Sequence, residues 1–182
     1  MMNRRRMYLA VAGALLAAAV IMPGAVLATS PCTHATTWWT PSNQGSRTIT
    51  PPGGTANTIY ARFSSTWKKD TFDPITICYS IAGTSRAAWT GTVPYNATNV
   101  KLVDQWHVDG LGITVGLPPG AGFSIDGTTL SWETDAPTNW HNDHSFVDFW
   151  FKVVIPLGYW EQATGFFTFG GSSYNVNAYA QH

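Results

Sequence analysis

The sequence predicts an all-β protein: a single-domain antiparallel β-sandwich, of the immunoglobulin-like or jelly-roll type, with about nine or ten strands and one disulfide. Three observations support this fold class. Short segments of alternating apolar and polar residues follow one another, turn-forming residues separate them, and aromatic residues make up 14% of the chain. Regularly spaced short strands rich in β-branched and aromatic residues are typical of sandwiches and jelly rolls.

Residues 1–28 predict a secretory signal peptide, and residues 29–182 are expected to form the sandwich domain. The segment Arg4–Arg6 is basic, an uncharged apolar run follows it, and Val26 and Ala28 occupy the positions that a signal peptidase inspects. An uncleaved membrane anchor is the alternative, because the apolar run approaches spanning length. After cleavage no membrane span is expected, and the protein is predicted to be secreted or held at the cell surface.

The two cysteines, Cys32 and Cys78, both follow the predicted signal peptide. In an oxidising compartment two cysteines most simply pair with each other. A redox-active thiol pair is the alternative, but it requires a spacing such as Cys-x-x-Cys, which the chain lacks. We therefore expect one structural disulfide that ties the start of the domain to a strand.

Period-two alternation locates three early strands. The segments 57–64, 74–81 and 100–108 alternate apolar and polar side chains over most of their length. Such alternation predicts strands that turn one face toward the core. The apolar faces consist of Ile59, Ala61 and Phe63; Ile75, Ile77, Tyr79 and Ile81; and Val100, Leu102, Trp106 and Val108.

Residues 144–155 give the clearest alternation in the chain. Asp148 and Lys152 lie out of phase with an unbroken apolar series. This pattern predicts a central strand with its bulky face in the core. The apolar series consists of Val147, Phe149, Phe151, Val153 and Ile155.

Turn residues mark the ends of these segments. The dipeptide Asp126-Gly127 predicts a β-hairpin that joins residues 123–125 to residues 128–132. Clusters of Pro and Gly at 51–54 and 118–120 mark further breaks. No internal repeat and no low-complexity linker divides the sequence, so one domain is expected.

Composition excludes several classes of function. Charged residues are only 11% of the chain, and ten basic residues balance ten acidic ones. A disordered protein has the opposite balance of charge and bulk. A nucleic-acid-binding protein needs surplus Lys and Arg to neutralise phosphates, so no nucleic-acid partner is expected.

The aromatic residues are candidates for ligand contact. A sugar ring has an apolar face edged by hydroxyl groups, so its binding site requires exposed rings beside short polar side chains. Burial in the core is the alternative for any single ring. Adjacent residues of a strand face opposite sides, which leaves one ring of the neighbouring tryptophans outside the core. The candidate ligand-binding residues are Trp38, Trp39, Trp140, Tyr159 and Trp160.

Histidine and aspartate pairs are candidates for metal binding. His107 and Asp109 would share one face of a strand. His141 and His144 would face opposite sides of a strand, so they could bind one ion only from a loop. Neither spacing is specific, and surface histidines bonded to water or backbone are the preferred interpretation. No metal and no other cofactor is expected.

Glu133, Asp135 and Glu161 are candidate catalytic residues, because a glycoside hydrolase uses two carboxyl groups across a cleft. Glu133 and Asp135 would share a strand face about 7 Å apart. Solvated carboxylates at a strand end are the alternative. No Gly-x-Ser-x-Gly elbow that would display a serine nucleophile occurs. A protein without catalytic residues is therefore the preferred interpretation.

Two uncharged segments, 36–40 and 172–180, are candidate edge strands. Such a strand either completes its own sheet or pairs with another subunit. The preferred function is a secreted, non-catalytic sandwich that binds a polysaccharide, a surface glycan or another cell-surface ligand through exposed aromatic residues. A structural subunit of a surface assembly, self-associating through edge strands, is the alternative. A small β-sandwich glycoside hydrolase is the second alternative.

Overall fold

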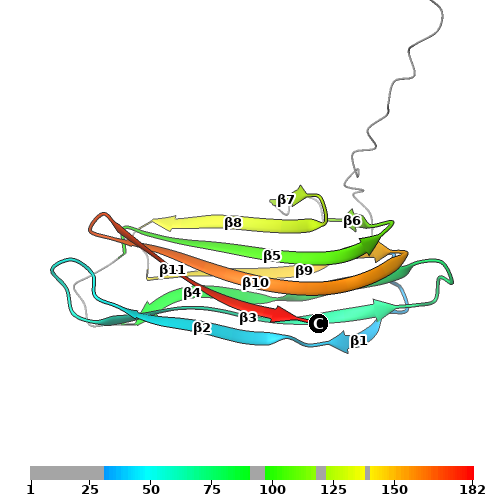
Figure 1. Cartoon of the computed structure of the whole chain (residues 1–182), viewed down its shortest axis with the longest axis horizontal. Helices are drawn as coiled ribbons and strands as arrows, with labels where there is room; N and C mark the ends of the chain where they lie inside the picture. Colours follow the sequence, from blue (N-terminus) through cyan, green and yellow to red (C-terminus); the bar gives the residue numbers. More distant parts are fainter. Residues whose placement is uncertain (1–30, 91–96, 118–121, 138–139) are drawn as a thin grey trace, which may run out of the picture.

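A computed structural model describes residues 31–90, 97–117, 122–137 and 140–182. The predicted signal peptide at residues 1–28 lies outside this part of the chain. Two antiparallel sheets pack against each other, and their strands run along the long axis of the molecule (Figure 1). Within the described ranges, no helix has the length and apolar character needed to cross a membrane.

The first sheet has six strands in the order β1-β3-β4-β9-β6, and β2 pairs with β3 next to β1. All its ladders are antiparallel. The long strands β3 and β4 form a continuous hairpin at its centre, and β9 joins them from later in the chain. The strands are β1 (Thr36–Trp39), β2 (Ser42–Ile49), β3 (Asn57–Asp70), β4 (Ile77–Thr90), β6 (Thr114–Gly116) and β9 (His141–Val153).

The second sheet has five strands in the order β11-β10-β5-β8-β7. It contains the hairpins β7–β8 and β10–β11, and β5 lies between them. The chain crosses from one sheet to the other between β4 and β5, again before and after β6, and again before and after β9. The strands are β5 (Asn99–Leu111), β7 (Phe123–Asp126), β8 (Thr129–Pro137), β10 (Ile155–Phe169) and β11 (Ser172–Gln181).

The predicted fold class is confirmed, with eleven strands in the described residues in place of nine or ten. The predicted hairpin is also confirmed, because Asp126 pairs with Thr129 across the turn. Gly127 has a φ angle of 58°, a conformation that glycine adopts without steric cost.

Strict alternation fails in the predicted strand 144–155. A β-bulge shifts the register between β4 and β9, so Phe146 and Phe149 are both buried although they lie three residues apart. The strand ends at Val153, and Ile155 opens β10 with half of its surface exposed. Ile75, expected on an inner face, is also exposed, because β4 begins only at residue 77.

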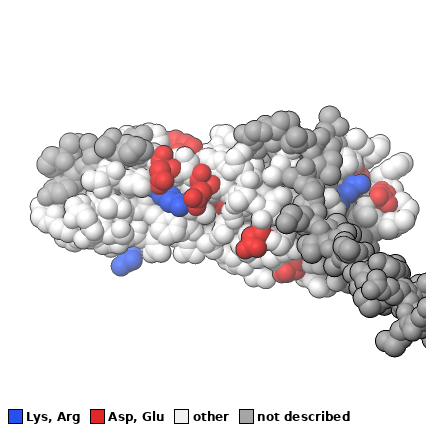
Figure 2. Space-filling model, turned by 90° about the horizontal axis from the view of Figure 1, so that it is seen from above, with Lys and Arg blue, Asp and Glu red and all other residues white. Residues whose placement is uncertain are grey.

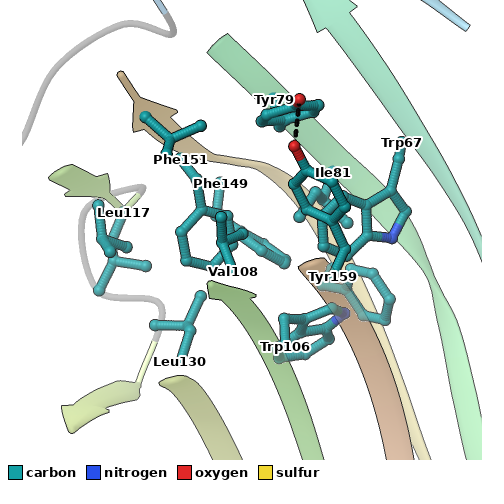
Figure 3. Packing of buried hydrophobic residues seen from close by; sticks show 13 residues of the cluster. Trp67, Tyr79, Ile81, Trp106, Val108, Leu117, Leu130, Phe149, Phe151 and Tyr159 are labelled. Carbon is teal, nitrogen blue, oxygen red and sulfur yellow. Dashed lines mark hydrogen bonds between the residues drawn. The ribbon is translucent and has the colours of Figure 1, made fainter. Parts of the chain in front are cut away.

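Two apolar clusters fill the space between the sheets. In the first core cluster, Trp67 and Tyr79 of one sheet meet Trp106 and Tyr159 of the other (Figure 3). The hydroxyl groups of Tyr79 and Tyr159 share a buried hydrogen bond, drawn as a dashed line in Figure 3. The second core cluster includes Ile59, Phe63, Leu102, Phe167 and Phe169.

Cys32 and Cys78 form the predicted disulfide. Their Cα atoms are 5.5 Å apart, and both side chains are buried next to Trp150 on the outer side of the six-stranded sheet. The bridge connects residues 46 positions apart, so it fixes the segment before β1 to the start of β4.

Reduction of this disulfide should lower the free energy of unfolding by about 4 kcal/mol, because it removes a constraint on the unfolded chain. The measurement is guanidinium unfolding with and without reductant. A protein with both Cys32 and Cys78 changed to Ser should match the reduced wild type, and should show no further response to reductant. Equal stability of oxidised and reduced protein would contradict this account.

The two sheets approach each other closely along one long side, where β2 of the first sheet meets β11 of the second. The side-chain amide of Asn43 donates a 2.6 Å hydrogen bond to the backbone carbonyl of Tyr179. A Cβ atom built on Gly45 would lie 1.9 Å from the backbone oxygen of Asn177. Only a glycine lets the two backbones come this close.

Gly45→Ala should therefore destabilise the protein by about 1–3 kcal/mol, the usual cost of overpacking. Gly158→Ala is the matched control, because the nearest atom to its added Cβ lies 3.6 Å away. Thermal unfolding followed by circular dichroism compares the two variants. A Gly45→Ala protein that melts with the Gly158→Ala control would show that the close approach of β2 and β11 does not contribute to stability.

Candidate functional site

The strands turn every second side chain outward, so each sheet carries a solvent-facing surface. We call the outer surface of the five-stranded sheet the amide face and that of the six-stranded sheet the arginine face, after the side chains described below. Each face has a shallow groove, of about 750 Å³ on the amide face and about 800 Å³ on the arginine face. The predicted site residues are distributed over these two faces, the core and one edge.

The groove of the amide face is lined mainly by uncharged polar side chains from β5, β10 and β11. Carboxamide groups are the most frequent among them, and each can donate and accept hydrogen bonds at once. Thr164 and Thr168 contribute hydroxyl groups to the same groove. The five carboxamide residues are Asn99, Gln105, Gln162, Asn175 and Asn177.

Aromatic rings border one end of this groove and also lie within it. At the end, the ring centroids of Trp160 and Tyr179 lie 6.1 Å apart, and Tyr179 is 40% exposed. Further along β10, Phe166 lines the groove with 40% of its surface exposed. Tyr179 pairs with Gln162 in the ladder, and Phe166 follows four residues later on β10, a separation of about 13 Å along the strand.

The predicted catalytic pair lies on the amide face. Glu133 and Asp135 point outward from β8, as their spacing predicted, but each has a local partner. Glu133 forms a 2.8 Å ion pair with Lys101, and Asp135 accepts a 3.0 Å hydrogen bond from Asn99. The third candidate, Glu161, lies in the core and does not join them.

His107 and Asp109 share the amide face, as expected, with 2.7 Å between Nε2 and Oδ1. The imidazole of His107 also stacks on Trp160, with 5.0 Å between the ring centroids. The aspartate and the indole therefore fix the orientation of the imidazole. In the described residues no three His, Cys, Asp or Glu side chains converge on a point that could hold a metal ion.

His141 and His144 lie on the same strand and face opposite sides, as predicted for a strand. His141 is on the arginine face, with Nε2 3.5 Å from the carboxylate of Asp143. His144 points inward and lies 2.7 Å from the carboxylate of Asp104. The sandwich therefore separates the two imidazoles.

Two parallel rows of side chains cross the arginine face and line its groove. In the first row Gln44, Arg62, Arg86 and Asp143 are cross-strand neighbours on β2, β3, β4 and β9. Arg86 donates two hydrogen bonds to Asp143, which holds the pKa of this carboxyl below its usual range. The second row consists of Ser42, Ser64, Thr84 and Ser145.

Trp140 is the most exposed of the predicted ligand-binding rings, with 48% of its surface accessible. It immediately precedes β9, and the guanidinium carbon of Arg86 lies 5.9 Å from the centroid of its ring. Trp140 therefore borders the groove of the arginine face.

Three other predicted rings are placed differently from expectation. Trp38 and Trp39 both pack against the first core cluster, because a register shift in β1 breaks the alternation that would separate them. Trp38 contacts Tyr159, and Trp39 contacts Trp67. Tyr159 itself is only 7% exposed, so the prediction that a loop displays it is wrong.

A buried polar layer separates the two core clusters. Asp104 and Glu161 point into the interior from β5 and β10, and both are 1% exposed. Ser65 and the indole of Trp67 donate hydrogen bonds to Oε2 of Glu161 from the opposite sheet. Ser85 donates in the same way to Asp104, so hydrogen bonds join the sheets at this level.

His144 completes the polar layer and connects it to the sandwich edge. Its ring stacks on Trp132 with 3.4 Å between centroids and a 5° angle between planes. The side chain is 10% exposed, whereas that of Asp104 is 2% exposed. A substrate outside the sandwich cannot reach Asp104 or Glu161, so these carboxyl groups serve the fold and not a surface reaction.

Burial raises the pKa of both carboxyl groups of this layer above the usual range. The pKa of Glu161 is raised to about 7, chiefly by desolvation and to a smaller extent by the nearby charge of Asp104, against the hydrogen bonds from Ser65 and Trp67. Desolvation also raises the pKa of Asp104, although His144 and Ser85 oppose the effect. Oε1 of Glu161 and Oδ1 of Asp104 have no hydrogen-bond partner among the described residues, which also disfavours the charged forms.

The pH dependence of stability follows from the raised pKa of Glu161. The folded state holds its proton more tightly than the unfolded chain, so this contribution is complete below pH 4.5 and is lost as the pH rises through 7. Between pH 4.5 and pH 8.5, wild type should lose up to about 3 kcal/mol relative to Glu161→Gln. Guanidinium unfolding at both pH values measures the difference. The exposed control Glu133→Gln should follow wild type; a Glu161→Gln protein with the same pH profile as wild type would contradict the assignment.

Sequence reasoning missed residues of both the buried polar layer and the outer surfaces. Asp104 lies in phase with the apolar series of its strand, so the alternation itself signals a buried carboxyl group. Tyr179 and Phe166 give no comparable signal, because only the strand order brings β11, β10 and β5 together.

The face drawn in Figure 2 carries few charged side chains, scattered over an otherwise uncharged surface.

Comparison with protein-family models and with curated protein sequences finds no match for this chain.

Proposed function

We propose that the protein is a secreted, non-catalytic β-sandwich that binds carbohydrate through its amide face. The observation that carries the proposal is a groove lined by carboxamide groups, with Trp160 and Tyr179 at one end and Phe166 further along it. Rings about 13 Å apart along β10 fit an extended chain of several sugar units better than a single small molecule.

The chemistry of the groove matches that of a neutral polysaccharide. Each sugar unit offers an apolar ring face that can lie on an aromatic side chain and hydroxyl groups that both donate and accept hydrogen bonds. Carboxamides complement hydroxyl groups in both roles, whereas carboxylates accept only. Lys101 and Glu133, which both line the groove, form an ion pair that adds no net charge.

A hydrolase is less well supported. Glu133 is engaged by Lys101, and Asp135 by Asn99. Glu161, whose raised pKa would suit a general acid, is sealed in the core. The buried Glu161 therefore cannot join Glu133 and Asp135 in the acid-and-base pair that glycoside hydrolysis needs.

Assembly through edge strands also has less support. The terminal strand β11 pairs with β10, and β2 of the other sheet lies against it at Asn177 and Tyr179. An incoming strand would compete with these contacts. The edge strands β1, β6 and β7 have four, three and four residues, a length that discourages strand addition.

Export is part of the proposal because of the disulfide. Bridges such as Cys32–Cys78 form and persist in oxidising compartments. This is consistent with the signal peptide that residues 1–28 predict.

Trp160→Ala and Tyr179→Ala should each weaken binding of a neutral polysaccharide about tenfold, equivalent to about 1.4 kcal/mol. Affinity electrophoresis in gels that contain a panel of neutral glucans, xylans and mannans measures the effect against gels without polysaccharide. Trp140→Ala is the matched control, because its ring lies on the other outer surface. Thermal unfolding checks that each variant is folded.

Two outcomes would contradict the proposal. Wild type that migrates normally through every neutral polysaccharide would remove carbohydrate binding at the amide face. Retardation that Trp160→Ala and Tyr179→Ala leave unchanged would place the binding site elsewhere on the molecule.

A further inference from the structure

The arginine face carries an arrangement of charge that the amide-face proposal does not use. Arg62 and Arg86 lie directly opposite each other in the ladder between β3 and β4. Like charges in this relation destabilise a sheet unless something compensates them. Both side chains line the groove of about 800 Å³.

Among the described residues, only Arg86 of the two arginines has a carboxylate in direct ion-pair contact, although the charge of Asp143 also acts on Arg62 at longer range. Asp143 is held by two hydrogen bonds from Arg86 and also lies 3.5 Å from the imidazole of His141. In the described part of the chain, no carboxylate lies within ion-pair distance of Arg62. The row therefore presents two guanidinium groups against a single carboxylate.

The guanidinium of Arg62 is exposed, and aromatic rings flank the arginine pair. Its central carbon lies 6.0 Å from the ring centroid of Tyr60, and that of Arg86 lies 5.9 Å from Trp140. Such contacts restrict the conformations of the arginine side chains, so less entropy is lost when they bind an anion.

The neighbouring row adds hydroxyl groups to the same groove. This row lies two residues along each strand from the arginine row, on the same face of the sheet. It consists of Ser42, Ser64, Thr84 and Ser145. A ligand that spans both rows would contact guanidinium groups on one side and the hydroxyl groups of short side chains on the other. Guanidinium groups match the two oxygens of a carboxylate or of a sulfate ester.

We propose that the arginine face is a second binding site, which takes an acidic glycan. A uronic acid carboxylate or a sugar sulfate would pair with Arg62, the sugar ring would lie toward Trp140, and its hydroxyl groups would contact the serine and threonine row. The site differs from the amide face in position and in the charge of its ligand, so either proposal can hold without the other. Nucleic acid fits less well, because the chain has no surplus of basic residues.

Affinity electrophoresis in two matched pairs of polymers tests the site. Polygalacturonate is compared with its methyl ester, and dextran sulfate with dextran, so that each pair differs mainly in the anionic group. Wild type should be retarded by an acidic polymer and not by its neutral counterpart, and added salt should weaken the retardation. Which of the two acidic polymers binds identifies the anion as carboxylate or sulfate.

Arg62→Gln should weaken this binding about tenfold, the usual loss for a hydrogen bond to a charged group. Arg47→Gln is the matched control: it removes the same charge from an exposed arginine that does not line the groove. Trp140→Ala should also weaken binding, whereas Trp160→Ala should not. Any binding of a neutral polysaccharide by the amide face should be unchanged in Arg62→Gln.

Three results would overturn the inference. Wild type that neither acidic polymer retards has no such site. Equal retardation by an acidic polymer and its neutral counterpart would show that the anion is not recognised. Equal weakening by Arg62→Gln and Arg47→Gln would show that only overall charge matters.

Discussion

The aromatic side chains on the inner surfaces of the two sheets hold the sandwich together. Trp67 and Tyr79 of the six-stranded sheet lie against Tyr159 of the five-stranded sheet, with ring centroids 4.9–6.0 Å apart. Burial of a large apolar side chain contributes about 1.5–3 kcal/mol, and an aromatic pair adds about 0.5–1.5 kcal/mol. Side chains alternate between the two faces of a strand, so the inward orientation of each of these rings also fixes which neighbouring residues of its strand face solvent. Both candidate binding surfaces are therefore consequences of core packing.

The two outer surfaces differ although the same alternation produces them. On the five-stranded sheet, carboxamides and partly exposed rings dominate, and the charged pair of Lys101 and Glu133 neutralises itself. On the six-stranded sheet, Arg62 and Arg86 leave one guanidinium without a carboxylate partner among the described residues. A rigid pleated sheet presents both sets of side chains at fixed spacings, so neither surface requires a loop to order on binding.

Local patterns in the sequence were enough to predict the fold class and the β7–β8 hairpin, and the presence of two cysteines was enough to predict the disulfide. Period-two alternation depends only on near neighbours, so it correctly identified the buried faces of Ile59 and Leu102. It failed at Phe146 and at the Trp38-Trp39 pair, because bulges depend on the partner strand. The grooves could not be predicted, because residues of β5, β10 and β11 become neighbours only through the strand order.

The polar layer has a consequence for how substitutions combine. Asp104 and Glu161 stand between the first and second core clusters, and the long strands contribute side chains to both. Volume changes propagate through direct contact, so two substitutions within one cluster should be non-additive in free energy. Substitutions on opposite sides of the carboxyl groups touch few common neighbours and should combine nearly additively. Apart from Trp132, which packs against both clusters, the two halves of the interior can therefore diverge in sequence separately. The polar residues between them are constrained by their hydrogen bonds across the sheets.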